Sequence, residues 1–165
     1  MIKGIFAVDH WGGMGINGTL PWPHHSEDLQ YFKAQTENHI VVMGRNTWDD
    51  PKMPKPLPKR ICYVATNRPI PTYTRIITGN IVDQIKNIQI IFPKLHVWII
   101  GGPNLLLQTR SLLDELHISH FKAGYKTDAK LDLNKFLLGF RVISSKPSTD
   151  RDCNWMVYKN IDLFR

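Results

Sequence analysis

Two adjacent carboxylates, Glu27 and Asp28, open an amphipathic run of the chain. The sequence predicts Ser26 as the N-cap of a helix there, and acids in a first turn interact favourably with the helix dipole, so capping alone would explain both carboxylates. Helix phase separates them, because Asp28 shares a face with Phe32 whereas Glu27 shares its face with the amphipathic Tyr31. An unpaired carboxylate against apolar surface has its charged form disfavoured, which suits it to hold or deliver a proton near neutral pH. We therefore predict that Asp28 faces inward, with capping as the alternative role.

Two apolar strands each run into glycine and then into a helix start. In VVMGRNTW (41–48) the backbone amides after Gly44 and the side chain of Arg45 fit a phosphate group, although a structural turn with an incidental arginine fits equally well. In HVWIIGGPNLLL (96–107) two glycines allow close backbone approach, and Pro103 suits the first turn of a helix. Two such junctions in one parallel sheet indicate a dinucleotide site, although neither has the spacing of the GxGxxG fingerprint.

Polar and basic side chains flank another candidate strand. Arg60 stands at its start, and Thr66, Asn67 and Arg68 follow its end. Such groups can hold a terminal phosphate, while solvation of an exposed surface would explain any one of them.

A glycine-rich loop follows the first strand. The Asn17-Gly18 pair supplies the positive φ angles of a tight turn, and three glycines precede it. We expect a long mobile loop here, which is either a lid over a site or a plain surface connection.

The elements that must position these residues are short apolar runs alternating with stretches of helical period, which predicts one α/β domain over residues 1–165. The expected strands are Ile2 to Val8, His39 to Met43, Arg60 to Ala65, Arg75 to Thr78, Leu95 to Ile100, Glu115 to Phe121, Phe140 to Ser145 and Trp155 to Asn160. The expected helices are Ser26 to Gln35, Ile81 to Phe92 and Pro103 to Leu113. We therefore predict a central, mostly parallel eight-stranded sheet with an antiparallel C-terminal strand and helices on both faces.

Composition narrows the class of protein. With 42% hydrophobic and 21% charged residues and no apolar run approaching a membrane span, we expect a cytoplasmic protein without a membrane partner. Cys62 and Cys153 are expected to be buried, reduced thiols, and the seven histidines lack ligand spacing, so no metal site is expected. The net charge of +7 indicates an acidic partner, either nucleic acid or a small anion such as a phosphorylated cofactor.

In their order, these residues resemble dihydrofolate reductase from Ile2 to about Tyr158. The motifs that carry the resemblance are GINGTLPWP, an acid on the following helix, VVMGRNTW, KPLPKR, WIIGG and TDAKL. The resemblance implies NADPH-dependent reduction of 7,8-dihydrofolate to tetrahydrofolate, by hydride transfer to C6 and protonation at N5, in support of one-carbon metabolism and thymidylate synthesis. It also implies a monomer that binds dihydrofolate and antifolates such as methotrexate, and no nucleic acid.

The same resemblance assigns roles around the substrate. Asp28 matches the family's single active-site acid, with Trp22, Leu20 and Ser119 completing the catalytic group. The substrate-binding set comprises Asp28 and Ser119 again, the backbone carbonyls of Ile5 and Ile100, the apolar walls Phe32 and Leu57, and Arg60, which matches the arginine that clamps the glutamate carboxylate.

On the cofactor side the resemblance implies a larger set. It comprises Ala7, Met14, Gly15, Ile16, Asn17, Gly18, Thr19, Leu20, Gly44, Arg45, Asn46, Thr47, Thr66, Asn67, Arg68, Gly79, Gly101, Gly102, Pro103, Asn104 and Leu105. Gly101-Gly102 matches a pair joined by a cis peptide in the family, and Asp128 matches an acid that hydrogen-bonds to the lid when it closes.

The chain departs from the family pattern at two positions. Leu106 stands where the family commonly has Tyr, so one hydroxyl is missing beside the reacting rings and a lower rate is expected. The spacing from Trp22 to Asp28 is one residue longer than in many bacterial members, which keeps Glu27 as a rival acid.

Two other functions compete with the folate interpretation. One is the NADPH-dependent reductase of riboflavin synthesis, which shares the fold; the acid after LPWP and the arginine of PLPKR favour folate. The other is a basic binding module. The distribution of basic residues argues against it, because they are scattered along the chain and do not form a stripe with aromatics.

Overall fold

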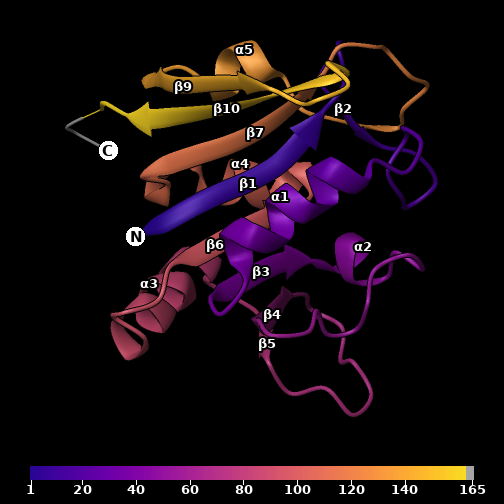
Figure 1. Ribbon diagram of the computed structural model, residues 1–165. Coiled ribbons are helices and arrows are strands. Elements are labelled where there is room, and N and C mark those ends of the chain that lie inside the picture. Colours follow the sequence, from indigo (N-terminus) through magenta and orange to yellow (C-terminus); the bar gives the residue numbers. More distant parts are fainter. Residues whose placement is uncertain (163–165) are drawn as a thin grey trace.

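The computed structural model describes residues 1–162, and its centre is an eight-stranded sheet of order β5-β4-β3-β6-β1-β7-β10-β9 (Figure 1). The strands are β1 Ile2–Val8, β3 Ile40–Gly44, β4 Ile61–Ala65, β5 Ile76–Ile77, β6 Val97–Gly101, β7 Glu115–Phe121, β9 Phe140–Pro147 and β10 Cys153–Asn160. Neighbours from β5 to β7 pair in parallel, whereas β10 is antiparallel to both β7 and β9. The predicted mostly parallel α/β sheet with an antiparallel C-terminal strand is confirmed.

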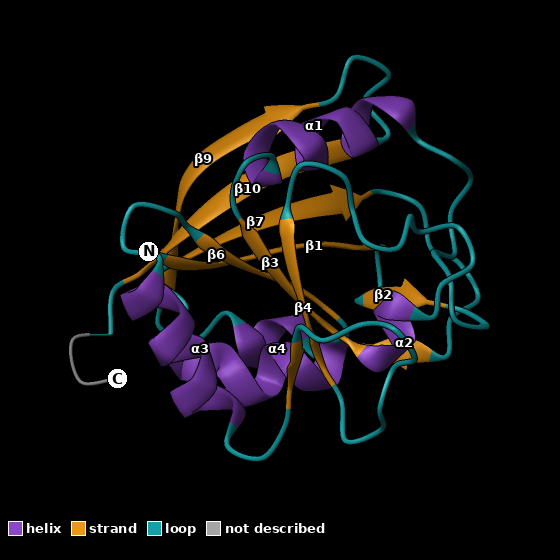
Figure 2. Cartoon of the chain, turned by 90° about the horizontal axis from the view of Figure 1, so that it is seen from below, coloured by secondary structure: helices purple, strands orange, loops and turns teal. Residues whose placement is uncertain are grey.

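Helices cover both faces of the sheet, as predicted (Figure 2). Helix α1 Ser26–Thr36 lies on one face, and α3 Ile81–Ile91 and α4 Pro103–Thr109 lie on the other. Two short helices, α2 Arg45–Trp48 and α5 Leu133–Phe136, complete the set, and among the described residues no helix has the length and apolar character to cross a membrane.

The predicted helix Pro103 to Leu113 was wrong at its C-terminal end. The α-helix ends at Thr109, and the chain continues as a 3-10 turn, Arg110–Leu112. The Thr109 hydroxyl donates to the Leu105 carbonyl at 2.8 Å, and this back-bonding by a β-branched residue weakens helix continuation.

The parallel strands are buried on both faces because helices lie above and below them. In β3 the side chains of Ile40 and Val42 join the core under α3 and α4, while Val41 and Met43 join the core under α1. Each fully buried side chain of this size contributes about 1.5–3 kcal/mol to folding. This two-sided core fixes the carboxyl ends of the strands at one edge, which is where ligands bind in open α/β sheets.

A second, two-stranded sheet was not predicted. It pairs β2 Gly13–Gly15 with β8 Ala129–Lys130, so the glycine-rich loop after β1 is anchored to a distant segment. The buried Asp9 carboxylate fixes the start of this loop, because it accepts hydrogen bonds from the backbone N–H groups of Trp11, Gly13 and Tyr125 at 2.7–2.9 Å. The anchored loop is thereby presented at the same edge of the sheet as the strand ends.

Candidate active site

The N-cap of helix α1 lies one residue before the expected position, at His25, so the prediction of Ser26 as N-cap was wrong. His25 is the last extended residue, with φ −122° and ψ 95°, and its Nδ1 accepts the backbone N–H of Asp28 at 3.1 Å. Ser26 is already helical, and its hydroxyl lies 3.5 Å from Gln30 Nε2. The cap therefore holds the backbone of the candidate acid itself.

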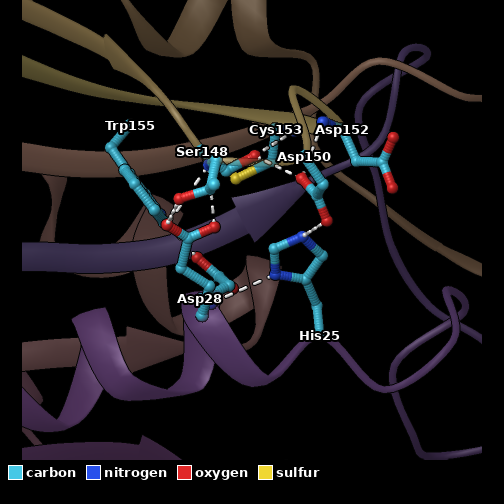
Figure 3. Close-up of polar contacts among 9 residues, drawn as sticks. His25, Asp28, Ser148, Asp150, Asp152, Cys153 and Trp155 are labelled. Carbon is cyan, nitrogen blue, oxygen red and sulfur yellow. Dashed lines mark hydrogen bonds and ion pairs between the residues drawn. The ribbon is translucent and has the colours of Figure 1, made fainter.

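The Asp28 carboxylate faces the sheet, as predicted (Figure 3). Its Oδ1 accepts hydrogen bonds from Ser119 Oγ at 2.5 Å and from Trp155 Nε1 at 2.9 Å. Ser119 on β7 and Trp155 on β10 are register partners, so the two donors stand side by side on one face of the sheet. Among residues 1–162 both donors bind the same oxygen, which leaves Oδ2 available to a ligand.

The rival acid Glu27 lies on a different side of the helix start. Its carboxylate accepts hydrogen bonds from Thr149, at 2.9 Å from the backbone N and 2.7 Å from Oγ1. Thr149 belongs to the turn between β9 and β10, so Glu27 clamps that turn to α1 and does not face the Asp28 donors.

A third contact joins α1 to the same turn. His25 Nε2 lies 2.9 Å from Asp150 Oδ2, and Asp152 lies close by (Figure 3). Because His25 Nδ1 accepts the Asp28 amide, Nε2 is the ring nitrogen that carries a proton, and it faces Asp150. No lone pair of that imidazole is left for a cation, so His25 and Asp150 form a contact between the helix start and the turn.

Aromatic side chains surround the acid. Trp22 is buried and stacks on Phe121 with ring centroids 4.4 Å apart, and Tyr31 stacks on Trp155 at 5.1 Å. The Tyr31 hydroxyl lies 3.0 Å from His117 Nδ1. Burial, with the nearby Asp28 carboxylate, raises the pKa of Tyr31 to about 12, and burial lowers the pKa of His117, so both are neutral near pH 7.

The residues predicted for the substrate come together beside Asp28. Ile5, Leu57, Phe32 and Ile100 belong to one apolar cluster on the α1 face of the sheet. The Arg60 guanidinium lies 5.9 Å from the Phe32 ring centroid and is held by the Pro58 carbonyl and the Thr36 hydroxyl, at 2.8 and 3.1 Å. Arg60 therefore stands at the outer end of the apolar wall.

The two glycine junctions also meet, because β3 and β6 are neighbours. A Cβ on Gly44 would lie 3.6 Å from both the Gly101 carbonyl oxygen and the Gly102 nitrogen, and the Gly101–Gly102 peptide is cis, as expected. Gly44 and Gly102 precede α2 and α4 without a side-chain cap. The remaining predicted junction residues, Asn46, Thr47, Pro103, Asn104 and Leu105, lie in these two helices.

The basic segment after β4 lies against α2. Arg45 Nη1 donates to the Arg68 carbonyl at 3.2 Å, and the Thr66 hydroxyl accepts the Arg68 amide at 3.1 Å. Asn67 accepts from Thr78 Oγ1 at 2.6 Å, which places it beside Gly79, whose φ is +78°. The predicted phosphate-holding residues are thus brought together at one end of the glycine junctions.

The loop after β1 reaches the other end of the junctions. Ile16 and Thr19 exchange backbone hydrogen bonds of 2.9 and 3.0 Å around the Asn17-Gly18 turn, and Met14 Cε lies 3.8 Å from a Cβ placed on Gly101. The expected contact with Asp128 is present, since Asp128 Oδ2 accepts the Asn17 amide at 3.0 Å and the Asp128 amide donates to the Gly15 carbonyl at 2.9 Å.

Three further residues singled out from the sequence lie in different surroundings. Ala7 packs against the aromatic cluster of Trp22 and is the β1 register partner of Ser119. Leu20 is 44% exposed between the loop turn and Trp22. Leu106, which replaces the expected tyrosine, belongs to α4, and its side chain is fully buried in the core.

Two residues that hold Asp28 were missed from the sequence. Trp155 donates to Asp28 across 127 positions, and no local pattern indicates such a contact. His25 is not among the side chains that most often cap helices, so the neighbouring serine was the stronger signal. The two buried, free thiols Cys62 and Cys153 are confirmed as expected.

The fold and the site together define an α/β protein that brings one held acid, an apolar wall and a pair of glycine junctions to the carboxyl ends of its strands. A model of the family described as dihydrofolate reductase matches residues 1–164. The chain belongs to the dihydrofolate reductase family.

Individual relatives agree with this assignment. The chain is 27% identical to dihydrofolate reductase type 9 of Escherichia coli over 161 residues, covering 94% of this chain and 89% of the relative. It is 32% identical to dihydrofolate reductase of Ureaplasma parvum over 141 residues, covering 84% and 87%. Among solved structures, a dihydrofolate reductase from Enterococcus faecalis complexed with NADP(H) and RAB-propyl has the same fold, with a TM-score of 0.79, 23% identity, and 98% and 97% of the two chains covered.

Proposed function

We propose that this protein reduces 7,8-dihydrofolate to 5,6,7,8-tetrahydrofolate with NADPH. The observation that carries the proposal is the Asp28 carboxylate, one oxygen of which is held by Ser119 and Trp155 while the other is left for a ligand. A pterin offers an amino group and a ring nitrogen side by side, and a carboxylate matches such a pair of donors.

The surroundings of Asp28 suit the rest of a folate. In this proposal the backbone carbonyls of Ile5 and Ile100 accept from the pterin, and Phe32 and Leu57, which belong to the same apolar cluster, provide the wall for its aromatic side chain. Large apolar side chains that remain exposed beside a polar anchor are typical of a ligand site, and Leu29, next to Asp28, is 42% exposed. Arg60 binds the terminal glutamate carboxylate, since its planar guanidinium matches a carboxylate in a bidentate way.

NADPH fits the glycine junctions. A Cβ on Gly102 would meet nothing within 4 Å, so there is open space beside the backbone at the start of α4. The backbone amides after Gly44 and Gly102 bind the pyrophosphate, and Arg45, Thr66 and Arg68 bind the additional phosphate of the adenosine half. When bound there, NADPH supplies the hydride that is transferred to C6 of the pterin.

The protein's own residues position the pterin and supply the proton. Asp28 orients the pterin and supplies the proton that reaches N5, directly or through a water molecule. Leu20, at the end of the loop of residues 14–20, and Trp22, just after it, close the site against solvent, and Asp128 holds that loop. Leu106 offers no hydroxyl near the reacting rings, so we expect turnover slower than that of relatives with tyrosine.

A coupled assay tests this function directly. The absorbance of NADPH at 340 nm should fall only when dihydrofolate is present, and methotrexate should abolish the fall at concentrations near that of the enzyme. A protein that leaves NADPH unchanged with dihydrofolate would refute the proposal. Oxidation of NADPH with a ribosylaminopyrimidine, insensitive to methotrexate, would instead identify the reductase of riboflavin synthesis.

We also propose a cytoplasmic monomer that supplies tetrahydrofolate for one-carbon metabolism and thymidylate synthesis. Two buried, reduced thiols suit a reducing compartment. Size-exclusion chromatography with light scattering tests the monomer, for which the expected mass is 19.1 kDa. Growth of a thymidine-requiring, reductase-deficient bacterial strain on expression of this chain tests the metabolic role.

A further inference from the structure

We propose that Trp155 is a positioning residue for Asp28, and that its indole N–H keeps Oδ1 an acceptor, so that the acid carries its proton on Oδ2, toward the ligand. This inference rests on the proposed function only for its link to turnover. The contact itself is a property of the folded chain.

The Trp155 ring is fixed by a stack against one of its faces and by a hydrogen bond from its N–H. The indole is 8% exposed and stacks on Tyr31, with an interplanar angle of 15°. Tyr31 is in turn held through its hydroxyl by His117, 3.0 Å away. A buried indole N–H needs an acceptor, and Asp28 Oδ1 is the acceptor that it meets at 2.9 Å.

Ser119 alone would not determine where the proton resides. A hydroxyl donates or accepts by rotating, so a protonated Oδ1 would still find a partner in Ser119 Oγ. An indole N–H only donates, and a protonated carboxyl oxygen is a weaker acceptor than the carbonyl oxygen, so a proton on Oδ1 would weaken the contact with Trp155. The proton of the neutral acid therefore resides on Oδ2, and when it passes to the ligand the carboxylate keeps both donors on Oδ1.

The other titratable groups near Asp28 are few. Burial raises the pKa of Cys153 on β10 to about 12, and Tyr31 on α1 is raised to the same value, so neither changes charge near neutral pH. His117 is kept neutral by its lowered pKa. The remaining titratable group is His25 at the helix start, which accepts the backbone N–H of Asp28 and has Asp150 and Glu27 nearby. A His25→Asn variant, which keeps a cap, measures how much His25 contributes to the pH profile.

The test compares Trp155→Phe with a matched control. Phenylalanine keeps an aromatic ring against Tyr31 but removes the N–H together with the rest of the five-membered ring. Trp98→Phe makes the same change in size on β6, where the indole nitrogen has no partner among the described residues, so it controls for the lost ring volume. In the holoenzyme, kcat/KM of Trp155→Phe should fall about tenfold, and the inflection of its pH profile should move upward by about one unit, because a donor to the charged form is lost. Trp98→Phe should leave the inflection in place. An unmoved inflection in Trp155→Phe would overturn the proposal.

A measurement on the wild-type protein tests the contact between Trp155 and Asp28 independently of turnover and of the folding of a variant. The indole N–H resonance of Trp155, one of five in the chain, should shift in a ¹H–¹⁵N spectrum as Asp28 titrates, and this shift should vanish in Asp28→Asn. A Trp155 resonance that does not shift during the titration overturns the inference even if the enzyme is active. A resonance that follows it in a protein without dihydrofolate reductase activity rejects the proposed function and leaves the contact in place.

Discussion

Glu27 and Asp28 are adjacent in the chain, yet their carboxylates bind different parts of the molecule. Glu27 accepts from Thr149 in the turn between β9 and β10, whereas Asp28 accepts from Ser119 on β7. The first contact clamps the C-terminal hairpin to the start of α1, and the second holds an acid beside an apolar wall. The helix start thereby separates a carboxylate that clamps the hairpin from the one that we propose as the catalytic acid.

The first prediction exploits this pair. Asp28→Asn keeps the size of the side chain but removes the charge and the proton, so turnover should fall at least about a hundredfold, the usual contribution of a general acid. Glu27→Gln makes the same chemical change one residue away and should retain most of the activity. Steady-state kinetics of both variants decide the matter; if Glu27→Gln is the inactive one, the assignment of the acid is wrong.

His25 should contribute to stability through its cap. Replacing His25 by Ala leaves the Asp28 amide without its acceptor and removes the contact with Asp150 Oδ2, and the loss of such a cap costs about 1 kcal/mol. Asn, a strong capping residue, should recover much of this loss. Urea unfolding followed by circular dichroism measures both variants; equal stability of His25→Ala and the wild type would contradict the cap.

Arg60 should affect substrate affinity more than chemistry. Lysine cannot reproduce the planar pair of donors, so Arg60→Lys should raise KM for dihydrofolate about tenfold or more while kcat changes little. Arg141→Lys, on the exposed strand β9, serves as the matched control and should behave as the wild type. A large fall in kcat at unchanged KM would place Arg60 in a different role.

The contact between Asp128 and the loop of residues 14–20 should influence turnover. Asp128→Ala removes the acceptor of the Asn17 amide but leaves the backbone bond to Gly15, so the loop loses one of its two anchors there. We expect kcat to fall about three- to tenfold, the equivalent of one hydrogen bond. Stopped-flow kinetics would locate the slower step, and Asp83→Ala, at an exposed position on α3, is the control.

Alkaline pH should destabilise the fold through buried groups whose pKa is raised by folding, of which Cys153 and Tyr31 have the large shifts. Folding raises the pKa of Cys153 from 9.0 to about 12 and that of Tyr31 from 10.0 to about 12, chiefly because burial disfavours the charged forms. The unfolded chain therefore releases these protons first, so their contribution is complete below about pH 9 and is lost progressively up to about pH 12. The urea midpoint should fall across this range, and it should fall less steeply in Cys153→Ala.

The sheet was predictable because its signals are local. Apolar runs such as Ile40–Gly44 are buried on both faces and therefore read as continuous hydrophobic stretches. The strands β2 and β8 have three and two residues, and β2 is mostly glycine, so neither carries a pattern that could reveal it. They form because Asp9 and the β8 segment bind backbone groups of the loop.

The residues of the candidate site were predictable from the sequence, whereas the residues that hold them in place were not. The position of Asp28 follows from the phase of a helix, and the meeting of Gly44 with Gly101 follows from parallel strands that end at one edge. Trp155 and Thr149 act on α1 from the far end of the chain, through the pairing of β10 with β7. Such contacts depend on three-dimensional packing that spacing along the chain does not encode.

The central place of β1 has a consequence for biosynthesis. Its neighbours are β6 and β7, so β1 has no partner on either side until residues 97–121 have been translated. Until then, a nascent chain displays two open strand edges and apolar side chains, which are the features that chaperones bind and that drive aggregation. The yield of active protein should therefore depend on chaperone capacity and on the concentration at which refolding is attempted.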